Sequence, residues 1–329
     1  MKNLVAAAMF FSACAVAQPP PTAVAIRNAR IVTVSGAPIA KGTVVIRNGL
    51  IESVGDGTQA IPAGALIVEG EGLTVYPGLV DALSTWGMPG SIAAGRGGTG
   101  GRGLATPTGP PSRGPEDRPA TTSWIKAADE IQVNDRRIET ARSAGFTSAV
   151  VFPTRGIFGG QGSLVNLAGA TSEEMVLVPS VGQYITMGRA ASGYPSALMG
   201  SIAYIRQIYL DAEHYRLVKE AYDRNPRGMK RPEYDRALEG VVESKRILLP
   251  ANREVEIDRM LRFAAELKQP AILYGIREGY RAAEVLKKSS TPVLISLKWP
   301  EKARDSNPDD EDSYRTLENR EKRRVPPES

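Results

Sequence analysis

The sequence predicts an α/β protein in which a small β domain precedes a longer region of strands and helices. Short β-branched runs separated by turns fill residues 23–75, and apolar runs alternate with helical stretches after residue 75. Such an alternation is typical of parallel strands joined by crossover helices. The chain has 329 residues, of which 42% are hydrophobic and 23% charged, enough for one or two domains with a core.

Composition excludes several classes of function. The formal net charge of +5 is spread along the chain and does not indicate a nucleic-acid partner. Cys14 is the single cysteine and His214 the single histidine, which excludes cysteine metal sites and any metal centre that needs two histidines.

The N-terminus is typical of an export signal. Residues 1–17 combine an early lysine, an apolar run and Ala15-Val16-Ala17, the small-x-small pattern that signal peptidase cleaves. The apolar run is shorter than the ~20 residues of a transmembrane helix, so we expect no transmembrane span and a periplasmic or secreted protein. Lipidation at Cys14 stays open, and residues 18–22 form a proline-rich linker.

Residues 23–74 are expected to form the β domain. Asn48-Gly49 lies between two apolar alternations and predicts a hairpin, because both residues tolerate positive φ. The strands predicted in this region cover 24–34, 42–47, 50–54, 66–69 and 73–76.

The region after residue 75 alternates strands with helices. We expect six strands at 75–83, 146–152, 175–181, 246–250, 270–274 and 292–297. We expect helices at 122–144, 195–225, 232–244, 254–267 and 280–288. The helix at 254–267 is the best supported, since its apolar residues follow the 3.6-residue period.

Two stretches interrupt this order. Residues 87–120 are rich in glycine, proline and arginine and predict a mobile loop, because they have few large apolar side chains to offset the entropy of ordering. Their Gly-x-Gly-x-x-Gly pattern lacks the flanking strand and helix of a nucleotide site. Residues 301–329 are charged throughout and predict a solvated tail.

Two motifs resemble the start of amidohydrolase-superfamily enzymes of the imidazolonepropionase type. They are the segment 50–55, Leu-Ile-Glu-Ser-Val-Gly, and the segment 73–81, which contains Pro77-Gly78-Leu79-Val80-Asp81. The resemblance extends from residue 23 to about residue 300. It implies a small β-sandwich over 23–74, a TIM-type (β/α) barrel over 75–300, and zinc-dependent hydrolysis of non-peptide carbon-nitrogen bonds in small cyclic amides.

The chain departs from this family where the metal would bind. The family has a His-x-His pair after the Pro-Gly-x-x-Asp turn, whereas Asp81-Ala82-Leu83-Ser84 contains no histidine. We therefore expect no metal and no cofactor. The family's last-strand aspartate is also missing, and six strands rather than eight predict an incomplete barrel whose open edge is covered by a partner chain or a second copy, unless the chain is a fragment.

Five residues are candidates for binding a small-molecule ligand. Arg155, Gln161 and Ser163 belong to a glycine-rich stretch that follows a predicted strand, where a ligand could approach the backbone. Asn252 and Arg253 follow another strand, although Asn252 is also suited to capping the next helix. The sequence leaves two functions open: an amidohydrolase-like protein deficient in metal ligands, or a non-catalytic exported binding or interaction module.

Overall fold

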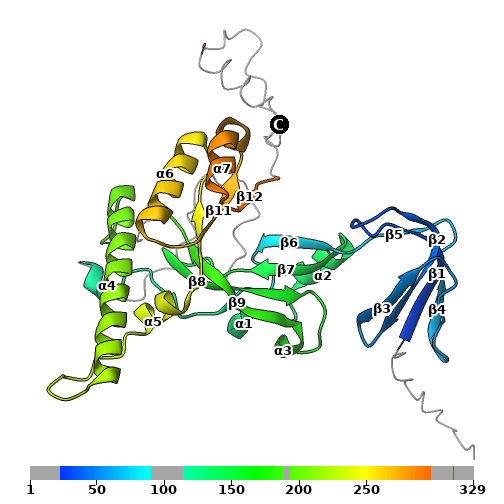
Figure 1. The fold of residues 1–329 in the computed structure, drawn as a ribbon, viewed down its shortest axis with the longest axis horizontal. Helices are drawn as coiled ribbons and strands as arrows, with labels where there is room; N and C mark the ends of the chain where they lie inside the picture. The colour runs from blue at the N-terminus through cyan, green and yellow to red at the C-terminus, as the bar shows by residue number, and fades with distance from the viewer. Residues whose placement is uncertain (1–22, 90–113, 189–192, 298–313, 315–329) are drawn as a thin grey trace, which may run out of the picture. The chain divides into compact units, whose positions relative to one another are not determined.

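The computed structural model describes residues 23–89, 114–188, 193–297 and 314. The chain divides into two compact units, Met1–Gly78 and Leu79–Ser329 (Figure 1). The predicted signal peptide with Cys14 and the linker at 18–22 lie outside the described residues. Among the described residues, no helix is both long enough and apolar enough to cross a membrane.

The first unit contains one five-stranded sheet. Its strands are β1 Ala23–Ile31, β2 Ile39–Arg47, β3 Leu50–Gly55, β4 Leu66–Glu69 and β5 Thr74–Val75. The order is β3-β2-β1-β4, and β5 pairs with the second half of β1. Asn48-Gly49 forms the predicted hairpin turn between β2 and β3, with positive φ at both residues.

The β-sandwich expected for residues 23–74 is not seen among the described residues, since all five strands join one sheet. The strands themselves lie close to the predicted positions. A bulge in β1 at Asn28, where φ is 58°, lets the strand pair with β4 before the bulge and with β5 after it. One sheet results because β1 pairs with β2, β4 and β5, while β2 also pairs with β3.

The second unit contains a nearly closed, barrel-like sheet of seven strands. They are β6 Leu79–Ser84, β7 Phe146–Val151, β8 Phe158–Asn166, β9 Val176–Ile185, β10 Ile247–Pro250, β11 Ala271–Ile276 and β12 Val293–Ile295, in the order β12-β11-β10-β9-β8-β7-β6. The six predicted strands are all present and run in the same direction. The seventh, β8, was not predicted as a strand and runs antiparallel to both of its neighbours.

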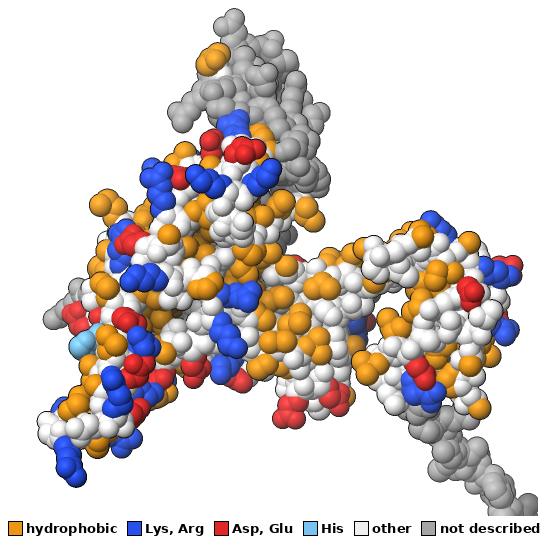
Figure 2. All heavy atoms as spheres, in the orientation of Figure 1, with side chains coloured by type: hydrophobic (Ala, Val, Ile, Leu, Met, Phe, Trp, Pro, Cys, Tyr) orange, Lys and Arg blue, Asp and Glu red, His pale blue; other side chains and the backbone are white. Residues whose placement is uncertain are grey.

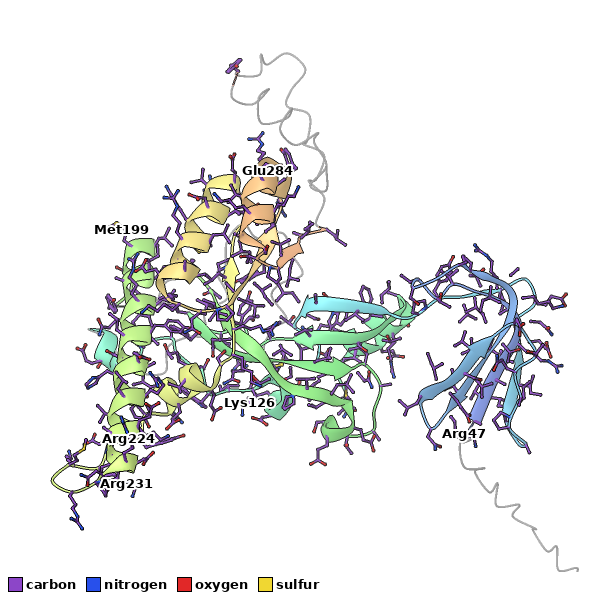
Figure 3. All side chains as sticks on the ribbon, viewed as in Figure 1. Arg47, Lys126, Met199, Arg224, Arg231 and Glu284 are labelled. Carbon is purple, nitrogen blue, oxygen red and sulfur yellow. The ribbon has the colours of Figure 1, made fainter. Side chains whose placement is uncertain are left out.

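Helices pack on one face of this sheet. They are α1 Ala127–Glu130, α2 Arg136–Ser143, α3 Ser172–Met175, α4 Leu198–Arg224, α5 Arg236–Glu243, α6 Glu254–Glu266 and α7 Ala283–Ser289, with short 3-10 helices at Pro115–Asp117 and Gly279–Ala282. Met199 and Arg224 mark the two ends of α4 in Figure 3. One core cluster joins α4, α5 and α6 to strands β8 to β11, and a second joins α1 and α2 to β7 and β8.

Two predictions for this unit need correction. The helix expected over 122–144 is interrupted, because the chain pairs with β8 at Lys126 and then turns between α1 and α2. The mobile loop expected over 87–120 is ordered at both ends. Met88 is buried, and a 3-10 helix spans Pro115–Asp117.

Candidate functional site: the inner face of the seven-stranded sheet

The face of the seven-stranded sheet opposite the helices, here called the inner face, is apolar. Period-two alternation directs every second side chain of each strand to this side. At its centre lie Phe152, Leu248 and Tyr274, which are almost fully buried. Around them pack the partly buried side chains of Leu83, Val150, Val181, Tyr184, Ile272 and Leu294.

Three aromatic rings pack together on the inner face: Phe152 just after β7, Tyr184 on β9 and Tyr274 on β11. The rings of Tyr184 and Tyr274 are stacked with centroids 4.9 Å apart, and Phe152 lies 5.5 Å from Tyr184. The Tyr274 hydroxyl donates to the carbonyl oxygen of Ile185 over 3.0 Å. Burial raises the pKa of both Tyr184 and Tyr274, so both phenols stay neutral at physiological pH. We call these three residues the aromatic cluster.

The glycines of β8 make room for the aromatic cluster. A Cβ atom at Gly162 would lie 2.1 Å from Cε1 of Phe152, closer than any real contact. The ring of Phe152 therefore lies directly against the backbone of β8. The glycine-rich stretch was expected to let a ligand approach the backbone. In the structure the ring of Phe152 occupies this position.

Gln161 and Ser163 lie on β8 but point away from the inner face, and both are buried. The Gln161 amide donates to the backbone carbonyls of Ser123 and Gly240 over 3.4 and 3.1 Å, and its oxygen accepts from Ser180 over 2.5 Å. Ser163 donates to the carbonyl of Pro179 and accepts from the amide of Ala128, each over 2.8 Å. These hydrogen bonds tie β8 to its neighbouring segments.

Arg155, Asn252 and Arg253 are exposed, and they follow β7 and β10 at the carboxyl end of the parallel strands. Arg155 donates to the carbonyl of Pro89 over 2.8 Å. Arg253, rather than Asn252, is the N-cap residue of α6, and it pairs with Glu256 over 2.8 Å. Strands β8 and β9 separate the two loops, so the structure does not gather the five predicted residues at one place.

Asp81 on β6 is the half-buried carboxyl group at the end of the Pro-Gly-Leu-Val-Asp motif. Its Oδ1 accepts from the backbone amide of Leu83 over 3.1 Å. Burial raises its pKa, while this hydrogen bond lowers it to a smaller extent. No ion pair to Asp81 is found among the described residues.

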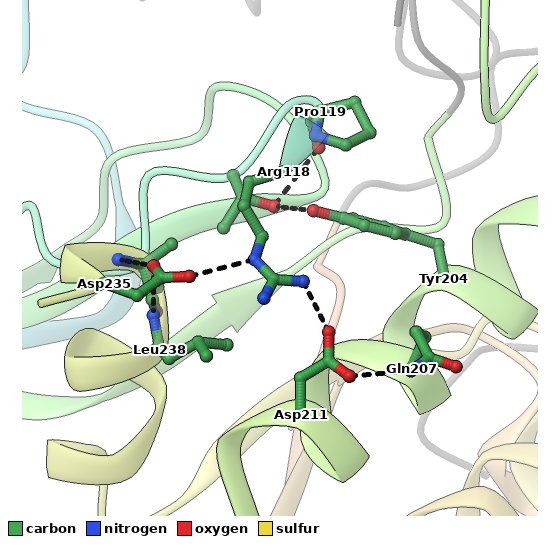
Figure 4. A network of polar contacts seen from close by, with 10 residues as sticks. Arg118, Pro119, Tyr204, Gln207, Asp211, Asp235 and Leu238 are labelled. Carbon is green, nitrogen blue, oxygen red and sulfur yellow. Dashed lines mark hydrogen bonds and ion pairs between the residues drawn. The ribbon is translucent and has the colours of Figure 1, made fainter. Parts of the chain in front are cut away.

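A polar network lies on the helical side, where Arg118 bridges two helices (Figure 4). Its guanidinium pairs with Asp211 on α4 over 2.5 Å and with Asp235, the N-cap of α5, over 3.2 Å. Nearby, the hydroxyls of Thr121 and Tyr204 share a hydrogen bond of 2.5 Å. Both carboxylates belong to the same chain as the arginine. The network therefore holds the segment around Arg118 against α4 and α5.

The residues of the inner face do not fit a zinc ion. Zinc in hydrolases is held by imidazole and carboxylate ligands. The chain has a single histidine, His214, which is exposed on α4. Within the described ranges, no three histidine, cysteine, aspartate or glutamate residues lie close enough together to hold a metal ion. Hydrocarbon side chains and neutral phenols occupy the inner face instead.

Sequence reasoning missed the aromatic cluster, although part of its signal was present. Alternation along β7 and β11 places Phe152 and Tyr274 on the same side as Val150 and Ile272. Tyr184 was harder to place, because the register of β9 against β8 shifts at several points. The unrecognised strand β8 also hid the glycines against which the cluster packs.

Comparison with known proteins identifies the fold. No family model matches the chain, and no curated protein matches it. Among solved structures, an amidohydrolase from Thermotoga maritima MSB8 is similar with a TM-score of 0.67 and 24% sequence identity, over 83% of this chain and 70% of that one. An L-hydantoinase from Arthrobacter aurescens matches with a TM-score of 0.39 and 12% identity, over 83% of this chain and 57% of that one. The similarity to the Thermotoga maritima structure shows that the chain has the fold of that amidohydrolase.

Proposed function

We propose that this protein is an exported binding module with the amidohydrolase fold, without metal-dependent hydrolysis. The aromatic cluster is the observation that carries the proposal. Enzymes with a TIM-type barrel bind substrate at the carboxyl ends of the strands, where a metal would activate water. In this chain Phe152, Tyr184 and Tyr274 fill the inner face, and none of them can activate water at neutral pH.

Two separate places are proposed for binding, Arg155 after β7 and Asn252 with Arg253 after β10. All three are exposed at the carboxyl end of the parallel strands, the edge at which barrel proteins bind their ligands. Arginine side chains favour carboxylates, and an exposed asparagine can both donate and accept. An anionic or amide-bearing small molecule therefore suits either place. Gln161 and Ser163 would act only by holding β8 in place.

Two assays on the mature full chain test this function. Hydrolysis of hydantoin, a cyclic amide, is measured with and without added zinc, and we expect no rate above that of the buffer in either case. Thermal shift is then measured with hydantoin and with its ring-opened product N-carbamoylglycine, which carries a carboxylate. We expect stabilisation by the carboxylate compound, reduced in the double variant Arg155→Gln/Arg253→Gln.

A matched control uses arginines elsewhere on the surface. Arg216→Gln and Arg262→Gln remove exposed arginines that pair with neighbouring carboxylates on α4 and α6, as Arg253 does. Ligand stabilisation should be unchanged in that double variant. Zinc-dependent hydrolysis of hydantoin would refute the binding-only function and favour a carbon-nitrogen hydrolase, the second function that the fold allows.

A further inference from the structure

The end of α4 and the loop that joins it to α5 carry a cluster of basic residues. Residues 223–234 contain Arg224, Arg227, Lys230 and Arg231 against two carboxylates. We call this segment the basic tip. Figure 3 labels Arg224 and Arg231 at this end of α4, and Figure 2 shows lysine and arginine side chains there at the surface. Every residue from 223 to 231 is exposed.

A tight turn gives the basic tip its shape. α4 ends at Arg224, and Pro226 cannot continue a helix because it has no N–H group to donate. The backbone amide of Met229 donates to the carbonyl oxygen of Pro226 over 3.2 Å and closes a β-turn, in which Gly228 has a φ of 76°. A Cβ atom at Gly228 would meet no described atom within 4 Å, so the turn faces solvent.

Contacts between α4 and α5 hold both ends of the basic tip. The Tyr215 hydroxyl donates to Glu239 over 2.8 Å, and Lys219 pairs with the same carboxylate. Asp235, which caps α5, pairs with Arg118 over 3.2 Å. The turn is therefore presented on a fixed base, which reduces the conformational entropy that a binding partner must offset.

Most of the positive charge of the basic tip is not neutralised by the described chain. Lys230 pairs with Glu233 over 2.9 Å, but both side chains are 86% exposed, and such surface pairs are weak. Arg224, Arg227 and Arg231 form no ion pair with any residue that the structure describes. Their charge is available to an anionic partner outside the chain.

Apolar side chains lie among these cations. Tyr234 is 77% exposed and Met229 39%, and neither belongs to a core cluster of the described chain. A tyrosine side chain suits the boundary between water and lipid, because its ring is apolar and its hydroxyl polar. Cations combined with exposed apolar groups favour a lipid surface over a purely polar polyanion.

We propose that the basic tip binds the surface of a membrane that contains anionic phospholipids. A layer of headgroups accommodates an exposed turn, whereas a bound peptide needs a groove or a free strand edge. The guanidinium groups of Arg227 and Arg231 match lipid phosphates, which they can bind through two hydrogen bonds each. Met229 and Tyr234 add apolar contact at the level of the headgroups.

The first unit does not offer a strongly acidic surface that could take the place of the lipid. Residues 23–78 contain four basic and four acidic residues, and two ion pairs, Arg27 with Glu69 and Arg47 with Glu52, already use half of them. The acidic run at 309–312 is a stronger competitor and lies outside the described residues. Its charge is therefore removed in one of the variants below.

Sedimentation of the full chain with lipid vesicles tests the proposal. Vesicles of phosphatidylcholine alone are compared with equimolar phosphatidylcholine and phosphatidylglycerol. We expect binding to the mixed vesicles only, weakened at least about tenfold in Arg227→Gln/Arg231→Gln, because each arginine near an anionic surface contributes to binding. The control Arg142→Gln/Arg259→Gln removes two exposed arginines of α2 and α6 and should bind nearly as the wild type does.

A second double variant, Met229→Ser/Tyr234→Ser, tests the apolar contact and should weaken binding severalfold without changing its salt dependence. Its failure to weaken binding would show a general attraction of cations to anions and would overturn the lipid proposal. So would a wild-type chain that ignores the mixed vesicles, equal binding to phosphatidylcholine alone, or equal weakening by the two arginine pairs.

Binding that appears only after residues 309–312 are changed to their amides would assign the basic tip to the chain's own acidic run, and would also overturn the proposal. Circular dichroism of each variant checks that the fold is intact. This inference does not rest on the proposed ligand binding, since Arg155, Asn252 and Arg253 take no part in it. A thermal shift with N-carbamoylglycine can fail while vesicle binding succeeds, so the two failures are distinguishable.

Discussion

The inner face of the seven-stranded sheet and the edge strands of the five-stranded sheet, β3 and β4, both carry apolar side chains but differ in burial. On the inner face, Phe152 and Leu248 are 1% and 2% exposed, because neighbouring strands curve around them. In the five-stranded sheet, Ile51 and Leu66 are more than half exposed, because they lie on the edge strands β3 and β4. Apolar residues on alternate positions therefore do not by themselves make a core. Curvature or a second layer must close over them.

The largest difference in unfolding free energy should appear when one large side chain is removed from each of the two sheets. Phe152→Ala leaves a cavity in the aromatic cluster and should cost about 3–5 kcal/mol of unfolding free energy. Ile51→Ala removes an exposed side chain and should change the unfolding free energy by no more than about 0.5 kcal/mol. Urea unfolding monitored by circular dichroism measures both. Equal losses would mean that the inner face is not packed as described.

Adding a single carbon tests the close approach of Phe152 to β8. Gly162→Ala places a Cβ atom against the ring and should destabilise the protein by about 1–3 kcal/mol through overpacking. Gly36→Ala is the control in the other unit, since its Cβ would meet only one atom, at 3.6 Å. A neutral Gly162→Ala would show that the ring of Phe152 can move aside, and would leave room for a ligand on the inner face.

The loss of a part-buried ion pair should cost more unfolding free energy than the loss of an exposed one, although both effects should be smaller than those above. Asp235→Asn keeps an oxygen for the N-cap of α5 but removes the charge that faces the part-buried Arg118, and should cost about 1 kcal/mol. Glu52→Gln breaks an exposed pair with Arg47 and should cost a few tenths of a kcal/mol, about the value of surface pairs. Thermal unfolding at two salt concentrations measures both. A larger loss for Glu52→Gln would reverse the comparison.

The smallest effect concerns two aspartates whose pKa values shift in opposite directions. Burial raises the pKa of Asp81, so its ionisation destabilises the fold above its titration range and this cost disappears as the pH falls. Hydrogen bonds from Thr58 lower the pKa of the exposed Asp56, so its contribution is present at neutral pH and is lost in acid. Asp81→Asn should therefore stabilise the protein at pH 7 and lose that advantage in acid.

Urea unfolding at neutral and acidic pH provides the measurement for both aspartates. Asp56→Asn is the control and should give no gain at neutral pH, because the aspartate there already contributes favourably. If Asp81→Asn destabilised the protein at neutral pH, the carboxylate of Asp81 would have a stabilising partner that the described contacts do not include.

The local elements of this fold were largely predictable, whereas their closure was not. Asn48-Gly49 marked its hairpin, and the period of residues 254–267 marked α6, because both signals are local. Strand β8 was missed because its glycines resemble those of a loop. Gly162 instead leaves room for the ring of Phe152, which lies close in space although it is not adjacent in sequence. The joining of all five strands of the first unit into one sheet likewise depends on β1 changing partners at Asn28.

The candidate site illustrates the same limit. Residue type and position after a strand selected Gln161 and Ser163, but the direction of β8 turns both toward the helices and the buried segments beside them. Arg155 and Arg253 were placed correctly at the carboxyl end of the strands, because each follows a strand that was recognised. The lack of histidine ligands follows from the composition alone. Identifying the side chains that fill the inner face requires the register of the strands, which the sequence does not give.

Counting bound metal tests the central claim most directly. The protein is dialysed to equilibrium against buffered zinc, freed of unbound ions, and measured by elemental analysis alongside the Phe152→Ala variant. A packed inner face without zinc ligands predicts that both proteins retain far less than one zinc per chain. Retention of one zinc per chain by the wild-type protein would contradict the account and would restore a metal-dependent hydrolase.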